Sequence, residues 1–263
     1  MGVLFRLSLS RYAWSRRTLI VTLLFSLPTL LVLLALYVDP GASTREARWH
    51  TEVEYRVVFW LIPHALLPLV ALLYATGMIQ DEIEEQTLTY LLVRPLPRWS
   101  IYTVKLLAVL SLTVALAALF TAAADVAIHW GAPELWGEII PGRVFKTSAL
   151  FALSLSAYCG MFGLVSLLIR RALLVGVAYV FLFEVVFANF DFVVRRMTVI
   201  YYFRVLARRW LGLSASDWSI NLDLAPSATT CVLVLAGTCL ATTVVAAALF
   251  TVREFRQKTP EGR

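Results

Sequence analysis

The chain has 263 residues, of which 60% are hydrophobic and 15% are charged, and its mean hydropathy is +0.79. Soluble domains of this length carry far more charge, so the composition excludes a soluble globular protein and predicts an integral membrane protein. The formal net charge of +6 does not indicate nucleic acid binding, because the arginines of membrane proteins gather in cytosolic loops and beside anionic headgroups.

Six apolar stretches are long enough to cross a membrane as helices, since a crossing takes about 20 residues. They cover residues 18–38, 57–79, 101–124, 147–169, 172–190 and 229–252. The first is long enough to span and lacks a small-residue cleavage site after it, so we expect an uncleaved anchor. Only Arg170 and Arg171 separate the fourth stretch from the fifth, which predicts a tight helical hairpin. No repeat or separate soluble domain interrupts the pattern, so residues 1–263 are expected to form one domain.

An even number of spans places both termini on the same side of the membrane. Positive charge favours the cytosolic side for them, because the segments on that side carry Arg6, Arg11, Arg16, Arg17, Arg94, Arg98, Lys105, Arg170, Arg171, Arg253, Arg256, Lys258 and Arg263. The five arginines between residues 195 and 209 disagree, although long translocated loops weigh less in this rule. We therefore predict a multi-pass protein of the inner (plasma) membrane with cytosolic termini.

The connection between the second and third stretches concentrates its charge in one short segment. Four carboxylates open a helix-like run with leucines at helical spacing, and Arg94-Pro95-Leu96-Pro97-Arg98 ends it. The segment comprises Asp81, Glu82, Glu84, Glu85, Leu88, Leu91, Leu92, Arg94 and Arg98. Its order, followed by Lys105 at the start of the third stretch, resembles the cytoplasmic loop of ABC-2 family permeases, the membrane subunits of one branch of ATP-binding-cassette transporters.

The resemblance implies that this segment is a cytosolic coupling helix that docks in a groove of a separate ATPase subunit. The carboxylates would make its polar contacts, the three leucines its apolar ridge, and Arg94-Pro95 with Arg98 the turn back to the membrane. Gln86-Thr87 stands where members of the family commonly have a glycine before the threonine. This departure favours a stiffer helix rather than a loss of docking.

The same resemblance implies further parts of the fold and its partners. At the N-terminus, where residues 4–17 mix apolar and basic side chains without a single basic face, it implies an interfacial connecting helix. It also implies short outer-face helices between spans five and six. The partners would be a second permease copy and two ATPase copies, which hold ATP and Mg²⁺, while this chain binds no cofactor.

Residues 191–228 alternate aromatic residues with arginines and are too basic to cross a bilayer. Tyrosine, tryptophan and arginine together suit the headgroup zone. We therefore expect helical pieces that lie at the outer interface or dip back against the bundle.

The sequence offers few candidate catalytic residues. The histidines, His50, His64 and His129, are dispersed, and the sequence has no HExxH, no GxSxG and no glycine-rich loop for ATP phosphates. Cys159, Cys231 and Cys239 lie in apolar stretches without metal-site spacing. The chain is therefore expected to lack an ATPase site, a catalytic residue and a metal site. The adjacent Glu84-Glu85 pair leaves an intramembrane hydrolase as a third reading.

His64 and Glu184 are ionisable residues inside predicted spans, where such groups are costly enough to indicate function. Both lie roughly 10 Å below the outer surface at 1.5 Å per residue, so they are close enough in depth to bond to each other. The resemblance places their spans at the dimer interface and along the translocation path. A polar contact that only fixes helix packing is the alternative. Pro63 and Pro68 are expected to kink the second span.

The main prediction is a permease subunit of an ABC transporter, which exports a substrate by alternating access. The apolar spans favour a lipid-like, peptide or drug-like molecule. The alternative is a non-transporting assembly subunit that transmits ATPase work to protein partners on the outer face. Arg204, Arg208 and Arg209 would then belong to a docking surface.

Overall fold

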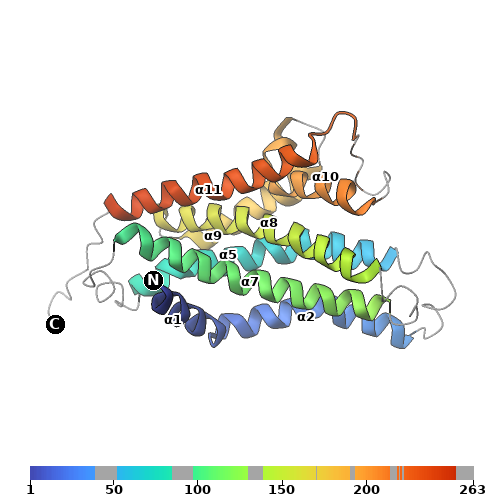
Figure 1. Cartoon of the computed structure of the whole chain (residues 1–263), viewed down its shortest axis with the longest axis horizontal. Coiled ribbons are helices and arrows are strands. Elements are labelled where there is room, and N and C mark those ends of the chain that lie inside the picture. Colours follow the sequence, from blue (N-terminus) through green and yellow to red (C-terminus); the bar gives the residue numbers. More distant parts are fainter. Residues whose placement is uncertain are drawn as a thin grey trace.

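The fold is that of a computed structural model, which describes residues 1–38, 52–84, 97–129, 139–169, 171–189, 193–213, 218, 220 and 222–252. Within these ranges all regular secondary structure is helical (Figure 1). The elements are α1 (Gly2–Ala13), α2 (Arg16–Val38), η1 (Tyr55–Leu66), α5 (Leu67–Glu84), α7 (Arg98–Ile128), α8 (Ile139–Leu168), α9 (Ala172–Tyr179), η3 (Val180–Val186), η4 (Phe187–Asn189), η5 (Val193–Met197), α10 (Val199–Leu211) and α11 (Ala228–Val252). The prediction of a helical protein is confirmed for this part of the chain.

Five of the described helices are long and apolar enough to cross a membrane, which supports a multi-pass membrane protein. They are Arg16–Val38, Glu52–Glu82, Arg98–Ile128, Pro141–Leu168 and Ala228–Val252. The remaining predicted span forms a shorter apolar helix, Ala172–Val186. At 1.5 Å per residue it measures about 22 Å, less than the roughly 30 Å of a hydrocarbon core. The count of six spans therefore stays a prediction.

The helices extend beyond the apolar stretches at several charged ends. The second begins at Glu52 and reaches Glu82, and the third begins at Arg98. An apolar stretch predicted from hydropathy ends at the first charged residue, but backbone hydrogen bonds can continue the helix beyond that residue. The structure therefore adds turns that carry acidic and basic side chains.

The second long helix changes its winding part of the way along. Residues Tyr55–Leu66 form a π-helical segment, η1, and the α-helix α5 follows from Leu67. Pro63 lies inside η1 and Pro68 lies just after it. Each proline removes one backbone N–H donor from the hydrogen bonds of the helix. A π-helical turn is a local change of winding that can accommodate such a missing hydrogen bond.

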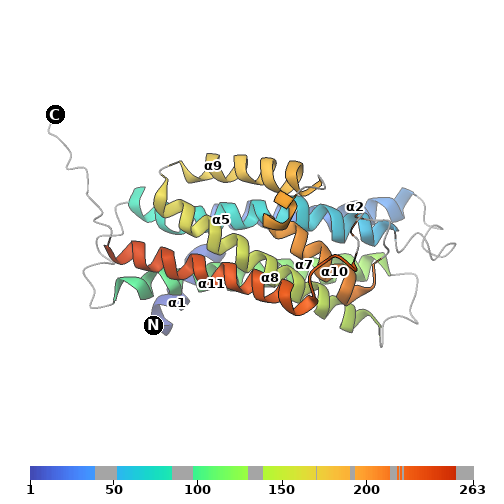
Figure 2. The ribbon, with the colours of Figure 1, turned by 90° about the horizontal axis from the view of Figure 1, so that it is seen from above.

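The long helices run side by side, and α1 lies across one end of them (Figure 1). We call this the N-terminal end; the last turns of α5 and α11 and the first turns of α7 lie there too, whereas α10 lies toward the opposite end (Figure 1). Helix α8 packs against α5, α7, α10 and α11. Helix α9 covers α5 and α8 from outside (Figure 2). Thus α8 forms the centre of the bundle.

Burial follows this arrangement. The helices Glu52–Glu82 and Pro141–Leu168 are mostly buried, whereas less than a quarter of the apolar window is buried in Arg16–Val38 and in Ala228–Val252. Leu23 on α2 and Leu240 on α11 are examples of exposed leucines. An apolar exterior of this kind suits lipid rather than water.

A glycine on α8 allows α11 to approach closely. A Cβ atom built at Gly160 would lie 2.4 Å from Thr242 Oγ1 and 3.3 Å from the Cα atom of Cys239, both on α11. Small residues at helix contacts permit such approach in membrane bundles. The α8–α11 contact therefore depends on this position.

We expect Gly160→Val to push α11 away from α8 and to destabilise the bundle by about 1–3 kcal/mol, the usual cost of overpacking. Thermal unfolding in detergent measures the effect. Gly237→Val on α11 is the matched control, because a Cβ atom there meets nothing within 4 Å. Equal melting temperatures for the two variants would show that the close approach does not limit stability.

Candidate functional site

The predicted coupling segment lies only partly within the described residues. Asp81, Glu82 and Arg98 are described, whereas residues 85–96, and with them Glu85, Leu88, Leu91, Leu92 and Arg94, and the side chain of Glu84 lie outside. The role of the segment in docking an ATPase stays a prediction. Its two flanks, the end of α5 and the start of α7, carry the first candidate site.

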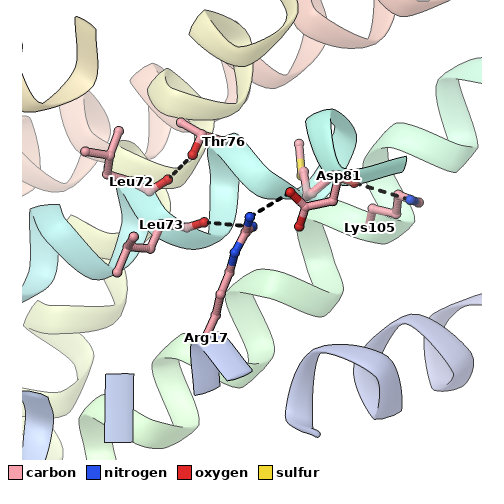
Figure 3. Close-up of polar contacts among 7 residues, drawn as sticks. Arg17, Leu72, Leu73, Thr76, Asp81 and Lys105 are labelled. Carbon is pink, nitrogen blue, oxygen red and sulfur yellow. Dashed lines mark hydrogen bonds and ion pairs between the residues drawn. The ribbon is translucent and has the colours of Figure 1, made fainter. Parts of the chain in front are cut away.

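The last turns of α5 are fastened to α2 by Arg17. Its Nη2 atom donates a hydrogen bond to Asp81 Oδ1 at 2.6 Å, and its Nη1 atom donates to the carbonyl oxygen of Leu73 at 3.3 Å (Figure 3). Gly77 makes room for the guanidinium, because a Cβ atom there would lie 1.4 Å from Arg17 Nη1. The first carboxylate of the predicted coupling segment, that of Asp81, is thus held by the first turn of α2.

Glu82 is directed toward α7, where it forms an ion pair with Lys105. Only 1% of Lys105 is exposed, and its Nζ atom also donates to the carbonyl oxygen of Met78 at 3.3 Å (Figure 3). Lysine is almost never fully buried without such a partner. Arg11 of α1 approaches the same carboxylate oxygen, with its Nη1 atom 3.6 Å from Glu82 Oε1. Glu82 therefore links α5 to both α1 and α7.

The turn between α1 and α2 packs against the same part of α5. The Thr18 hydroxyl donates to the carbonyl oxygen of Tyr12 and shares a hydrogen bond of 2.6 Å with the Tyr74 hydroxyl. Burial, and then the negative charge of Glu82, raises the pKa of Tyr12, so the phenol stays neutral. A cavity of about 120 Å³ lies here, lined by Arg11, Tyr12, Ser15, Arg17, Tyr74, Gly77, Met78, Asp81 and Glu82.

We call Arg11, Arg17, Asp81, Glu82 and Lys105 the N-terminal charge cluster. It joins four helices, α1, α2, α5 and α7, at the point where the chain leaves α5 for residues 85–96. The sequence pointed to the two acidic residues and to Lys105, but not to Arg17. The sequence around Arg17 does not indicate its partner, because Asp81 lies 64 residues away.

The second candidate site lies where α10 meets the long helices. Arg204 on α10 donates to His64 Nε2 from Nε at 3.1 Å and from Nη2 at 2.6 Å, and its Nη1 atom donates to the carbonyl oxygen of Ala188 at 3.2 Å. His64 Nδ1 lies 2.8 Å from the carbonyl oxygen of Trp60. Burial, and then the charge of Arg195, lowers the pKa of Arg204 to about 10, so it remains a cation near neutral pH.

Glu184 holds the start of α10. Its carboxylate accepts hydrogen bonds from the amides of Val199 at 3.3 Å and Ile200 at 3.1 Å, and from the Tyr179 hydroxyl at 3.3 Å. The next amide, of Tyr201, donates to the hydroxyl of Thr198, the N-cap residue, at 3.3 Å. The first backbone amides of a helix have no hydrogen-bond partner within the helix. In α10 the first three, those of Val199, Ile200 and Tyr201, all donate to side chains.

The direct bond between His64 and Glu184 considered from the sequence is not formed in the structure. Both side chains bind α10 instead, His64 through Arg204 and Glu184 through the first amides. Their depths in the sequence-predicted spans did not reveal that α10 binds both side chains. Their role in a translocation path or an interface stays a prediction.

Three other arginines of the α10 region donate hydrogen bonds to backbone oxygens. Arg195 donates to Trp218 and Arg208 to Ile220, and Arg209 donates to the carbonyl oxygens of Leu222, Ala225 and Pro226. Arg204 and Arg208 are buried, at 3% and 7% exposed. Arg204 and Arg208 are therefore not part of an exposed docking surface, whereas Arg209 is exposed. The assembly alternative stays a prediction.

A third polar contact was missed by the sequence reasoning. Glu54, which is 3% exposed, accepts a hydrogen bond of 2.5 Å from Arg143 Nε on α8. The Asp125 carboxylate on α7 is buried and has no hydrogen-bond partner among the described residues. Within the same residues no group of three or more histidine, cysteine, aspartate or glutamate side chains is placed to hold a metal ion.

These features define a class: a helical multi-pass membrane protein with charged groups buried at helix junctions. The sequence pattern of the family described as "ABC-2 family transporter protein" matches residues 14–189. This is about two thirds of the chain, so the chain belongs to the ABC-2 transporter family. No curated protein matches the chain. The matched region contains Arg17, His64, Asp81, Glu82, Lys105 and Glu184, and it ends before α10.

Proposed function

We propose that the chain is the permease subunit of an ABC transporter and that it exports its substrate. ATP hydrolysis takes place on a separate ATPase subunit, which holds ATP and Mg²⁺. The observation that carries the proposal is the N-terminal charge cluster, which ties four helices together next to residues 85–96 in a chain of the ABC-2 family. Two permease copies and two ATPase copies make the complete transporter.

The proposal includes the membrane topology. Six spans, with Ala172–Val186 as the short fifth, place both termini in the cytosol. The N-terminal end of the bundle then faces the ATPase, and α10 lies at the outer side. Helix α1 lies along the inner surface. Positive charge near the N-terminus, from Arg6, Arg11, Arg16 and Arg17, supports this orientation.

The mechanism follows from the contacts at the end of α5. Residues 85–96 dock on the ATPase, and closure of the ATPase moves them together with the last turn of α5. Arg17 transmits this motion to α2, and Glu82 transmits it to α7 through buried Lys105. Buried ion pairs are stiff because breaking one is costly. The helices therefore move as a unit and reshape a cavity between the two permease copies.

The proposal is tested by purifying tagged protein from native membranes and identifying bound proteins by mass spectrometry. Wild type should retain an ATP-binding-cassette ATPase, and Glu84→Lys/Glu85→Lys should lose it, because four units of charge change on the docking helix. Glu52→Lys/Asp223→Lys makes the same change at exposed sites toward the other end and should retain the ATPase.

Each other outcome is informative. Retention by the Glu84 and Glu85 variant would place docking elsewhere on the chain. Absence of an ATPase from every sample would overturn the permease proposal. The substrate class, an apolar or amphipathic molecule, is tested separately by substrate-stimulated ATPase activity of the reconstituted complex.

A further inference from the structure

The bonds around His64 define its protonation state. A carbonyl oxygen only accepts, so Nδ1 donates its proton to Trp60. The Arg204 guanidinium only donates, so Nε2 accepts with its lone pair from Nε and Nη2. This pattern fits one form of the ring, the neutral tautomer with its proton on Nδ1. A protonated ring would direct a second N–H at the guanidinium and place two cations in contact.

Arg204 attaches the middle of α10 to two other parts of the bundle. It binds His64 in η1 and the carbonyl oxygen of Ala188 in η4. Helix α10 also packs against α8 and α11, and Glu184 holds its first turn. Of the groups that Arg204 binds through these hydrogen bonds, His64 alone changes charge between pH 5 and pH 8.

We propose that His64 and Arg204 form a proton-sensitive lock, which holds α10 in the bundle while His64 is neutral and releases it when His64 takes up a proton. The ligand of this site is therefore a proton. The proposal concerns the position of α10 and does not depend on an ATPase or on transport.

The elements that pack against η1 carry other ionisable groups. Outside the N-terminal charge cluster they include Tyr37 of α2, Tyr74 of α5, Asp125 of α7 with His129 directly after it, and Arg208 of α10. Glu54, Tyr55 and Arg56 precede His64 on its own helix. Arg195, Tyr55, Glu184 and Tyr158 lie near Arg204. Tyrosines and arginines do not titrate between pH 5.5 and pH 8. Glu54, Asp125 and Glu184 are buried carboxyl groups, and they are unchanged in the His64 variant described below, whose pH profile therefore separates their contribution from that of His64. His129 is the other described histidine, and its Nδ1 donates to the carbonyl oxygen of Asp125. It serves as the control.

The direction of the pH effect follows from linkage. Locked His64 is neutral, whereas an imidazole exposed by release of α10 takes up a proton near pH 6.5. The lock is therefore at full strength above about pH 6.5 and weakens as the pH falls, with the equilibrium constant for release rising up to tenfold per unit. Between pH 8 and pH 5.5 it should rise about tenfold.

The lock is tested by the accessibility of a cysteine on α10. Val205 is fully buried on α10, so Val205→Cys, in a chain with Cys159, Cys231 and Cys239 replaced by alanine, reports release. The maleimide labelling rate of the folded full-length protein is divided by that of the unfolded protein at each pH, which removes the intrinsic pH dependence of the thiol. We expect protection to fall about tenfold between pH 8 and pH 5.5.

Three variants decide the cause. In His64→Gln a neutral amide oxygen still accepts from Arg204, so protection should not change with pH. His129→Gln should keep the tenfold fall. Arg204→Gln removes the cation that faces a protonated His64 and should reduce the fall even if His64→Gln packs poorly. A flat profile in the parent protein, a fall that persists in both the His64 and Arg204 variants, or a fall lost in His129→Gln would overturn the proposal.

Discussion

Replacing Glu82 with alanine is expected to destabilise the bundle by about 3–5 kcal/mol, because it leaves a buried charge without its partner. The side chains of Lys105 and Glu82 are 2% and 12% exposed, so water cannot replace the lost carboxylate. The carbonyl oxygen of Met78 remains as an acceptor for Lys105 but carries no charge. Equilibrium unfolding in mixed detergent micelles measures the loss.

The double variant Glu82→Ala/Lys105→Met separates charge burial from packing. Methionine fills much of the lysine volume without a charge, so the double variant should recover most of the stability lost in the single one. Glu52→Ala is the matched control: it breaks a pair with Arg56 whose side chains are 61% and 73% exposed, and it should cost at most about 0.5 kcal/mol. A Glu82 variant no less stable than this control would contradict the buried ion pair.

The second large effect is expected at Glu184. Its side chain is fully buried and accepts from the amides of Val199 and Ile200 and from the Tyr179 hydroxyl. Glu184→Leu leaves these three donors unsatisfied, and each buried unsatisfied group costs about 1–3 kcal/mol. We therefore expect a loss of at least about 3 kcal/mol in the unfolding free energy, or the detachment of α10.

Two further variants test the role of Glu184 in capping α10. Thr198→Val removes the acceptor for one amide, that of Tyr201, and should cost about 1 kcal/mol, the typical value of an N-cap. Glu184→Gln keeps one acceptor oxygen and should lie between the two. Labelling of Val205→Cys distinguishes detachment of α10 from global unfolding. If Glu184→Leu proved as stable as Thr198→Val, the carboxylate would not anchor the helix.

Both sites share one long helix. Glu52–Glu82 carries Glu54 and His64 toward the α10 end and Asp81 and Glu82 at the N-terminal end, with the π-helical segment η1 in its first half. Residues of the N-terminal charge cluster and the partner of Arg204 are therefore carried by the same helix. Most of this helix is buried, so its neighbours on both sides respond to a change in its position.

The class of protein, its family and five of the long helices could be predicted from the sequence alone. Apolar stretches of about 20 residues and the order of charges in residues 80–105 are local features, and a local pattern can be read without knowing which helices touch. The structure bears out the membrane class, and the match over residues 14–189 bears out the family. The fifth span stays a prediction, because the apolar helix Ala172–Val186 is shorter than the other five.

Only the tertiary structure decided which side chains are partners. His64 and Arg204 are 140 residues apart, and Arg17 and Asp81 are 64 apart, so no spacing in the sequence relates them. From the sequence we expected the arginines near α10 to lie in the headgroup zone. In the structure Arg204 and Arg208 are buried and donate to backbone oxygens. The physical reason is that a buried charge takes its partner from whichever helix the packing places beside it, and that packing depends on the whole bundle.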